Sequence, residues 1–187
     1  MRNVSLLISL LICLLHPYAF ARKNRSPLPK QNTADESSVK SPEDGETCFS
    51  PDEPCAIKLA KFIKSASTSI DIAIYSINED RVVHALLVQS KKVSVRIIVD
   101  RLQSKGNRSS VALLQKAGIP LRFGHQRGIM HDKFTIVDGK RIETGSFNYT
   151  DHAESSNQEN QIYLSTPQIA GRYKQRFEQM WSDSKPD

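Results

Sequence analysis

The chain has 187 residues, which is enough for one folded domain with a substantial core but leaves little room for a second. Its formal net charge of +6 gives a basic surface, and such surfaces attract polyanions such as nucleic acids or anionic lipid headgroups. Charge alone does not decide between these partners, and a basic surface with no binding role is common.

The first residues predict a cleaved secretory signal at 1–21. Arg2 gives a short positive start, residues 6–15 are almost continuously apolar, and Ala19 and Ala21 are the small residues that a signal peptidase requires. The apolar run is too short to span a bilayer as a helix, so cleavage is favoured over a retained anchor, which stays the alternative. The sequence therefore predicts an exported protein, either periplasmic or secreted.

Residues 22–47 are rich in Ser, Pro, Lys, Asn and Glu, which predicts a flexible linker before a folded domain at 48–187. Two cysteines, Cys48 and Cys55, follow the signal. An even pair in an exported chain favours a disulfide that closes a small loop. A zinc site is disfavoured because no histidine lies near the pair, and two unpaired thiols are the remaining alternative.

Helix and strand patterns alternate in the first half of the domain. Helical spacing of apolar residues predicts three helices, at residues 56–65, 80–90 and 109–117. Runs rich in Ile, Val and Ala predict three buried strands, at residues 69–77, 93–99 and 119–123. Such alternation is typical of parallel strands joined by helical crossovers.

The pattern changes in the second half. Strands are expected at 133–137 and 141–144, on either side of the hairpin turn pair Asp138-Gly139, and another at 160–164. The last helix is expected to begin at Thr166-Pro167, a cap followed by proline at the first helical position. The aromatic residues along that helix are assigned to the core rather than to base stacking. The predicted fold is an α/β sandwich around a mixed, mostly parallel sheet.

The stretch 131–148 carries the residues that point to chemistry. His131 and Lys133 share one face of a strand, because residues two apart point the same way. The ammonium disfavours protonation of the imidazole, which suits a neutral nucleophile beside a bound anion. After the hairpin, Ser146 and Asn148 bring a hydroxyl and an amide to the same opening as His131 and Lys133. Lysine, hydroxyl and amide donors around a histidine fit a tetrahedral phosphoryl group.

These residues form the pattern His-x-Lys-x4-Asp-x6-Gly-Ser-x-Asn with every spacing intact, and in this the chain resembles the phospholipase D superfamily. Its size and its single copy of the motif are most similar to the small bacterial endonucleases of that superfamily. The resemblance covers residues 48–181 and implies a phospholipase D-like α/β/α sandwich. It is highly specific for the superfamily and much less specific for the substrate.

The resemblance also implies a role for each motif residue. His131 matches the nucleophile that forms a covalent phosphohistidine, and Glu159 matches the carboxylate that orients the imidazole ring. The groups that match the ligands of the phosphoryl oxygens are Lys133, Ser146 and Asn148. Asp138 belongs to the signature but is expected to brace the hairpin rather than to act as a base.

Hydrolysis through a phosphoenzyme needs an acid for the leaving alcohol and a base for the incoming water. A histidine that has become the nucleophile cannot also protonate the leaving group. Since the chain holds one copy of the motif, we expect a homodimer in which His131 of the partner subunit completes the site. The alternative is that Glu159 is the acid.

No metal or other cofactor is required on this account. Beyond the predicted signal, three other histidines lack a partner at the spacing of a zinc site, namely His84, His125 and His152. His125 and Arg127 precede the motif and are candidates for lining the cleft mouth, although loop residues without a role are the simpler interpretation. Tyr75 and Ser76, which end a strand, are candidates for facing the site.

Three functions stay open at this point. A nonspecific endonuclease that cuts DNA is favoured because a small open dimer cleft suits a long polyanion, and RNA is left open as a second substrate. A phospholipase D acting on phosphatidyl lipids would need exposed apolar loops beside the motif, and the sequence suggests none there. A nucleic-acid or lipid binding module without turnover is disfavoured because His131, Lys133 and Asn148 are all retained. The glycosylation sequon Asn148-Tyr149-Thr150 falls on a proposed site residue, which favours a bacterial setting.

Overall fold

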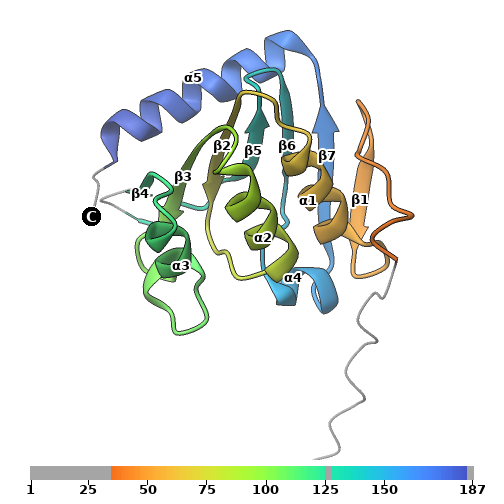
Figure 1. Ribbon diagram of the computed structural model, residues 1–187, viewed down its shortest axis with the longest axis horizontal. Coiled ribbons are helices and arrows are strands. Elements are labelled where there is room, and N and C mark those ends of the chain that lie inside the picture. The colour runs from red at the N-terminus through yellow and green to blue at the C-terminus, as the bar shows by residue number, and fades with distance from the viewer. Residues whose placement is uncertain (1–34, 125–127, 185–187) are drawn as a thin grey trace, which may run out of the picture.

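The computed structural model describes residues 35–124 and 128–184 (Figure 1). The predicted signal at 1–21, the linker as far as residue 34, and His125 and Arg127 lie outside the described residues. Within the described ranges, no helix has both the length and the apolar character needed to cross a membrane.

The described part of the chain is built from alternating strands and helices. The strands are β1 (Thr47–Ser50), β2 (Ser69–Ile74), β3 (Ser94–Asp100), β4 (Leu121–Gly124), β5 (Lys133–Val137), β6 (Arg141–Gly145) and β7 (Glu159–Leu164). The helices are α1 (Cys55–Lys64), α2 (Asp80–Gln89), the 3-10 helix η1 (Gln103–Lys105), α3 (Val111–Lys116), α4 (Asp151–Ser155) and α5 (Pro167–Asp183). Every element predicted from the sequence is present, whereas β1, η1 and α4 were not predicted.

The seven strands form one sheet in the order β1-β7-β6-β5-β2-β3-β4. Neighbouring strands are parallel only at β2–β3 and β3–β4, and the other pairings are antiparallel. The prediction of a mixed sheet is confirmed, but parallel neighbours are fewer than a mostly parallel sheet implies. The reason is that β5 and β7 run against all the other strands and are each inserted between two of them.

Helices cover both faces of the sheet, as an α/β/α sandwich requires. Helices α1 and α2 lie side by side on one face, and with α3 they enclose the larger apolar cluster (Figure 1). Helix α5 covers the other face, where Ala170 and Phe177 pack against Phe134 and Ile136 of β5. Because both faces are covered, every residue of β5 is buried.

The turn between β5 and β6 is fixed by Asp138, a motif residue with a positive φ of 56°. Its carboxylate accepts hydrogen bonds from the main-chain nitrogens of Ser67, Thr68 and Ser69 at 2.7–3.1 Å, and from the Thr68 hydroxyl. Burial acts to raise the pKa of Asp138, but these hydrogen bonds outweigh it and lower the pKa. Asp138 therefore ties the hairpin turn to the start of β2, at the end of the sheet away from His131.

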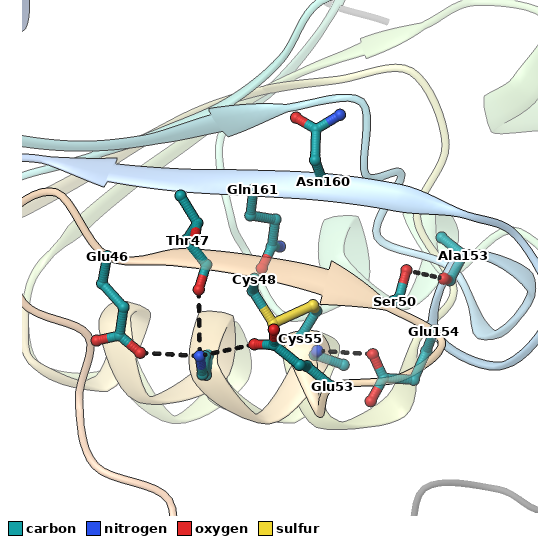
Figure 2. The surroundings of a disulfide bond; sticks show 12 residues. Glu46, Thr47, Cys48, Ser50, Glu53, Cys55, Ala153, Glu154, Asn160 and Gln161 are labelled. Carbon is teal, nitrogen blue, oxygen red and sulfur yellow. Dashed lines mark hydrogen bonds and ion pairs between the residues drawn. A yellow bond between two sulfur atoms is a disulfide. The ribbon is translucent and has the colours of Figure 1, made fainter.

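The first strand is fastened to the first helix by a disulfide between Cys48 and Cys55, whose Cα atoms lie 5.6 Å apart. Figure 2 shows the bond between β1 and the first turn of α1. Beside it, Glu154 of α4 accepts a hydrogen bond of 2.9 Å from the main-chain nitrogen of Ala56, at the otherwise uncapped start of α1 (Figure 2). These contacts hold together three segments that are far apart in the chain.

Residues before the predicted domain boundary at residue 48 already contact the folded domain, beginning with an ion pair between Glu36 and Lys64 of α1. Thr47 is the first residue of β1, and main-chain hydrogen bonds join Gly45 and Glu46 to Tyr163 of β7 at 2.7 and 2.9 Å. Lys58 of α1 also forms an ion pair of 2.8 Å with Glu46. The last residues assigned to the linker are thus part of the edge of the sheet.

Replacing both Cys48 and Cys55 with alanine is expected to lower the free energy of unfolding by about 2–3 kcal/mol, because a short cross-linked loop restricts the unfolded chain. Urea unfolding of the variant and of the oxidised parent measures the difference. The parent unfolded in the presence of a reductant should match the variant. Equal midpoints for the variant and the oxidised parent would show that the cross-link adds no stability.

A buried polar cluster lies between the sheet and α1. Glu143 of β6 is fully buried and accepts a hydrogen bond of 2.6 Å from the Tyr149 hydroxyl, which also bonds Thr135 at 2.7 Å. Burial raises the pKa of Glu143 from its ordinary value of 4.5 to about 8. Burial likewise raises the pKa of Glu154 to about 7. Both carboxyl groups are therefore stabilised in the folded protein as the neutral acid.

The raised pKa values of Glu143 and Glu154 predict that the protein loses stability as the pH rises from about 5 to 8. The folded state holds protons on Glu143 and Glu154 that the unfolded chain has already released, so its advantage is complete below the ordinary pKa and disappears as the pH passes the folded pKa. The free energy of unfolding should fall by at least about 1 kcal/mol over this range, which urea unfolding at several pH values measures. Glu143→Gln keeps an acceptor for Tyr149 and should flatten the slope. A parent protein with stability constant over that range would contradict the prediction.

Candidate active site

The predicted site residues gather at one edge of the sheet. Strands β2, β3 and β6 end at this edge, while β5 and β7 begin there. Lys133 and Glu159 are the first residues of β5 and β7, His131 lies two residues before β5, and Ser146 and Asn148 follow β6. Residues separated by up to 28 positions in the chain therefore converge because strand ends meet at one edge.

The His131 side chain is exposed at this edge and is supported by Tyr75, the residue after β2. Their ring centroids lie 4.6 Å apart at an angle of 70°, in an edge-to-face arrangement. The Tyr75 hydroxyl accepts a hydrogen bond of 3.0 Å from Gln103 in η1. Tyr75 thus faces the site, as the sequence suggested, whereas Ser76 uses its main-chain carbonyl to bind the nitrogen of Tyr149.

Lys133 is buried beside His131, with an exposed fraction of 8%. Its Nζ donates a hydrogen bond of 2.7 Å to the main-chain carbonyl of His131 and lies 5.3 Å from the centre of the Tyr75 ring. Burial lowers the pKa of Lys133, although Glu159 and Asp132 act to raise it. Within residues 35–124 and 128–184, the lysine has no ion pair with a carboxylate. A bound anion would therefore stabilise the charged form of this buried ammonium.

Ser146 and Glu159 are joined directly. The Ser146 hydroxyl donates to one oxygen of Glu159, and Asn157 donates to the other at 3.0 Å. Among the described residues Glu159 makes no hydrogen bond to His131, so the structure does not display the orienting contact that the resemblance implied. Glu159 instead lies close enough to Lys133 to favour its charged form.

Gly145 and Asn148 complete the motif on the strand side. A Cβ at Gly145 would overlap the main-chain carbonyl oxygen of Asn160 on β7, so this position of the motif accepts glycine alone. The Oδ1 atom of Asn148 is buried without a hydrogen-bond partner among the described residues. This oxygen accepts hydrogen bonds and cannot donate to a phosphoryl oxygen, so a phosphoryl ligand would be held through the Asn148 Nδ2 group.

Asp100, the last residue of β3, supports the site in a way that the sequence analysis missed. It is buried, and one carboxylate oxygen accepts a hydrogen bond of 3.0 Å from the main-chain nitrogen of Met130, the residue before His131. The other oxygen accepts from Leu102 and Gln103 at 2.9 and 3.0 Å. One carboxylate thus holds the segment that carries His131 and, through Gln103, the ring that supports the imidazole. Its place directly after a buried strand is the signal that could have identified it.

Asp100→Asn is expected to lower kcat about 10- to 100-fold with little change in KM, because an amide nitrogen cannot accept the hydrogen bonds that place His131. Steady-state kinetics on fully folded protein checks this. Asp71→Asn is the matched control, since Asp71 is equally buried but binds Arg96 and Lys174 on the α5 side. The control should lose stability and keep its kcat. If both variants lose kcat to the same degree, Asp100 is structural only.

Two other histidines of the described ranges lie outside this cluster. His84 on α2 and His152 on α4 are both exposed, and neither forms a hydrogen bond or ion pair with His131 or Lys133. In the part of the chain that the structure describes, no three His, Cys, Asp or Glu side chains are grouped as a metal site would need. His125 and Arg127 cannot be placed, since they lie outside the described residues.

Comparison with known proteins agrees with this geometry. The family model described as "Cardiolipin synthase, PLD-like domain" matches residues 59–181. A mitochondrial cardiolipin hydrolase from Chlamydomonas reinhardtii is 35% identical over 121 residues, which are 64% of this chain and 54% of that protein. A phospholipase D from Rickettsia conorii is 36% identical over 132 residues, which are 70% of this chain and 66% of that protein. The chain thus spans between about half and two thirds of these relatives.

Two solved structures are covered almost completely. Nuc from Salmonella typhimurium, a phospholipase D family member, superposes with a TM-score of 0.71 at 33% identity, over 75% of this chain and 95% of Nuc. NucT from Helicobacter pylori superposes with a TM-score of 0.70 at 25% identity, over 77% of this chain and 99% of NucT. With the family model matched across most of the domain and the motif residues gathered at one edge of the expected fold, the chain belongs to the phospholipase D-like family, whose motif it carries once.

Proposed function

We propose that the chain is a metal-independent phosphodiesterase that cuts DNA without sequence preference, with RNA as the second substrate to be tested. The observation that carries the proposal is Lys133, a buried ammonium without an ion-pair partner among the described residues, held beside the exposed imidazole of His131. A nucleophile next to a fixed positive charge is what attack on an anionic phosphodiester needs.

In this mechanism a nitrogen of His131 attacks phosphorus, and the bond from phosphorus to the leaving oxygen breaks. Lys133 and the Asn148 Nδ2 group hold the other phosphoryl oxygens as charge builds on them, whereas the single hydroxyl proton of Ser146 is donated to Glu159. A proton passes to the leaving alcohol from an acid, and water then attacks the phosphohistidine while the same group takes up a proton from that water. The products are an alcohol and a phosphate monoester, and His131 is regenerated.

The leaving alcohol must be protonated by an acid, and His131 of the same chain cannot provide that proton once it is the nucleophile. We propose a homodimer in which His131 of the partner subunit takes this role. Support comes from the single copy of the motif and from the position of His131, which is exposed at an open edge of the sheet. Glu159 as the acid is the alternative, and its contact with Ser146 argues against it because both of its oxygens already accept hydrogen bonds.

Nucleic acid is favoured as the substrate by the compact chain and its charge. The chain covers Nuc and NucT almost from end to end, whereas it covers only part of the cardiolipin hydrolases. The net charge of +6 favours a polyanion. The disulfide fits an oxidising compartment, which supports our proposal that the protein is exported to the periplasm or the medium.

A second candidate is hydrolysis of phospholipids, and one observation favours it. Leu102 and Ile129 are exposed by 69% and 50%, and their segments are fastened to the same Asp100 carboxylate beside His131. The expectation that no apolar loop side chain lies exposed near the motif is therefore wrong. Leu102 lies between Arg101 and Gln103, and Ile129 is followed by Met130 alone, so neither residue belongs to a long apolar run in the sequence. Two such side chains give a lipid surface a small point of contact.

The deciding experiment incubates the purified, oxidised protein with an excess of chelator and one of three substrates. These are plasmid DNA, RNA, and vesicles of phosphatidylcholine mixed with cardiolipin. We expect DNA to be nicked and degraded while the lipids stay intact. Release of headgroups or phosphatidic acid with intact DNA would select the second candidate. Activity that disappears with chelator and returns with a divalent cation would contradict the mechanism.

A further inference from the structure

Helix α5 carries a surface groove on the side next to the catalytic segment. Its volume is about 330 Å³, and it is lined by Ile169, Arg172, Tyr173 and Arg176. The four residues stand at positions i, i+3, i+4 and i+7 along the helix, so they lie on one face of it. Ile169 and Tyr173 are half-buried and form an apolar floor, while both arginines are exposed.

Two chains of contacts place this groove beside the active site. Arg176 lies 3.9 Å from the carboxylate of Asp132, the residue between the histidine and the lysine of the motif. The Tyr173 hydroxyl donates to Thr144 at 3.4 Å, and the Thr144 hydroxyl donates to the main-chain carbonyl of Lys133 at 3.1 Å. Arg176 at the rim of the groove and Tyr173 on its floor are therefore both linked to the segment that carries His131 and Lys133.

The positive charge of the groove is not cancelled by the rest of the helix. The neighbouring face of α5 holds a closed network of two cations and two carboxylates, with contacts of 2.6–3.0 Å, made by Asp71, Arg96, Lys174 and Glu178. In contrast, Arg172 has no ion pair with any residue in the described ranges. Arg176 has only the distant contact to Asp132, in which both groups are largely exposed and water weakens the attraction.

We propose that this groove binds the sugar-phosphate backbone of the nucleic-acid strand, next to the phosphate that His131 attacks. The inference rests on the proposed function and adds a second contact region to it. The planar guanidinium groups of Arg172 and Arg176 suit phosphate oxygens, and the apolar floor suits a sugar or the face of a base. Contacts of this kind read no base edges, which agrees with cleavage that has no sequence preference.

The test compares the parent with the double variant Arg172→Ala and Arg176→Ala, using long DNA at several salt concentrations. We expect KM for DNA to rise roughly tenfold at about 150 mM salt, with kcat maintained. The logarithm of KM should also depend less steeply on the logarithm of salt, by up to about 0.9 for each phosphate contact removed. Hydrolysis of bis(p-nitrophenyl) phosphate, which is too small to reach α5, is the reference activity.

The matched control is Lys91→Ala with Lys92→Ala, which removes two exposed cations just before β3, at the opposite edge of the sheet. An equal rise in KM for this control would show that net charge, rather than the groove, sets affinity, and would overturn the inference. The inference also fails if the arginine variant keeps the parent's KM and salt dependence, or if it loses hydrolysis of the small diester to the same extent as hydrolysis of DNA.

A binding measurement separates this inference from the proposed function. Fluorescence anisotropy of a labelled DNA oligonucleotide is recorded with His131→Ala protein, with and without the two arginine changes. Weaker binding after the arginine changes supports the groove even if the parent proves unable to cut DNA, in which case the proposed function alone fails. Binding that is unchanged for DNA but lost for cardiolipin vesicles would assign the groove to lipid and overturn the inference.

Discussion

His131→Ala should abolish phosphodiester hydrolysis, with a loss in kcat of about 10,000-fold or more, because no other described side chain can take the place of a covalent nucleophile. The imidazole is exposed and makes no side-chain hydrogen bond to a described residue, so the variant should unfold at the same urea concentration as the parent. Cleavage of DNA and of a small chromogenic diester, each measured with chelator present, gives the two rates. His152→Ala, which removes another exposed histidine, is the control and should keep full activity.

The same substitution tests the covalent intermediate. Rapid quenching of the parent in alkaline denaturant, in which the P–N bond of a phosphohistidine is stable, with a substrate carrying labelled phosphate should trap phosphorus on a peptide that contains His131. No label should be trapped on the His131→Ala protein. Label on Ser146, or turnover by the parent with no trapped species under any quenching condition, would require a different mechanism.

Lys133→Met should lower kcat about 100- to 1,000-fold, because it removes the positive charge that the proposed mechanism places against the phosphoryl oxygens. The same change should leave stability unchanged or raise it, since a buried ammonium without an ion-pair partner among the described residues is replaced by an apolar side chain of similar length. Activity and stability are therefore expected to move in opposite directions. Steady-state kinetics and urea unfolding measure the two quantities.

A positive charge that was needed only for folding would give the reverse pattern. Lys133→Met would then unfold more easily and lose activity in proportion to the unfolded fraction. Lys140→Met, at the exposed turn between β5 and β6, is the matched control and should change neither kcat nor the unfolding midpoint.

Local patterns in the sequence were sufficient for most of the fold. The Asp138-Gly139 pair placed the β5–β6 turn, and Thr166-Pro167 placed the start of α5, because the residues that decide these features are adjacent in the chain. Strand β1 was missed because it has four residues, two of them exposed, and is held by its pairing with β7 and by the disulfide. Such long-range partners leave no periodic signal.

The sequence predicted the part of the site that depends on short spacing along the chain. The motif spacing placed His131 and Lys133 together, since two residues apart on an extended chain suffices for that. Asp100 and Tyr75 could not be given their roles, because each acts on a segment about 30 to 55 positions further along the chain. The sequence did not predict the groove on α5 either, because its arginines come near the site only when the helix packs against the segment that contains Asp132.

The proposed catalytic residues and the residues proposed to contact the substrate lie on different parts of the structure, one buried and the other peripheral. Lys133 belongs to β5, a fully covered strand between β2 and β6, and cannot shift without disturbing the core. Leu102, Ile129 and the arginines of α5 stand on the periphery, where replacement disturbs little packing. If the proposed roles hold, substitutions at these peripheral positions alone would change which polymer or lipid is preferred, while the buried lysine and the strand that carries it stay unaltered.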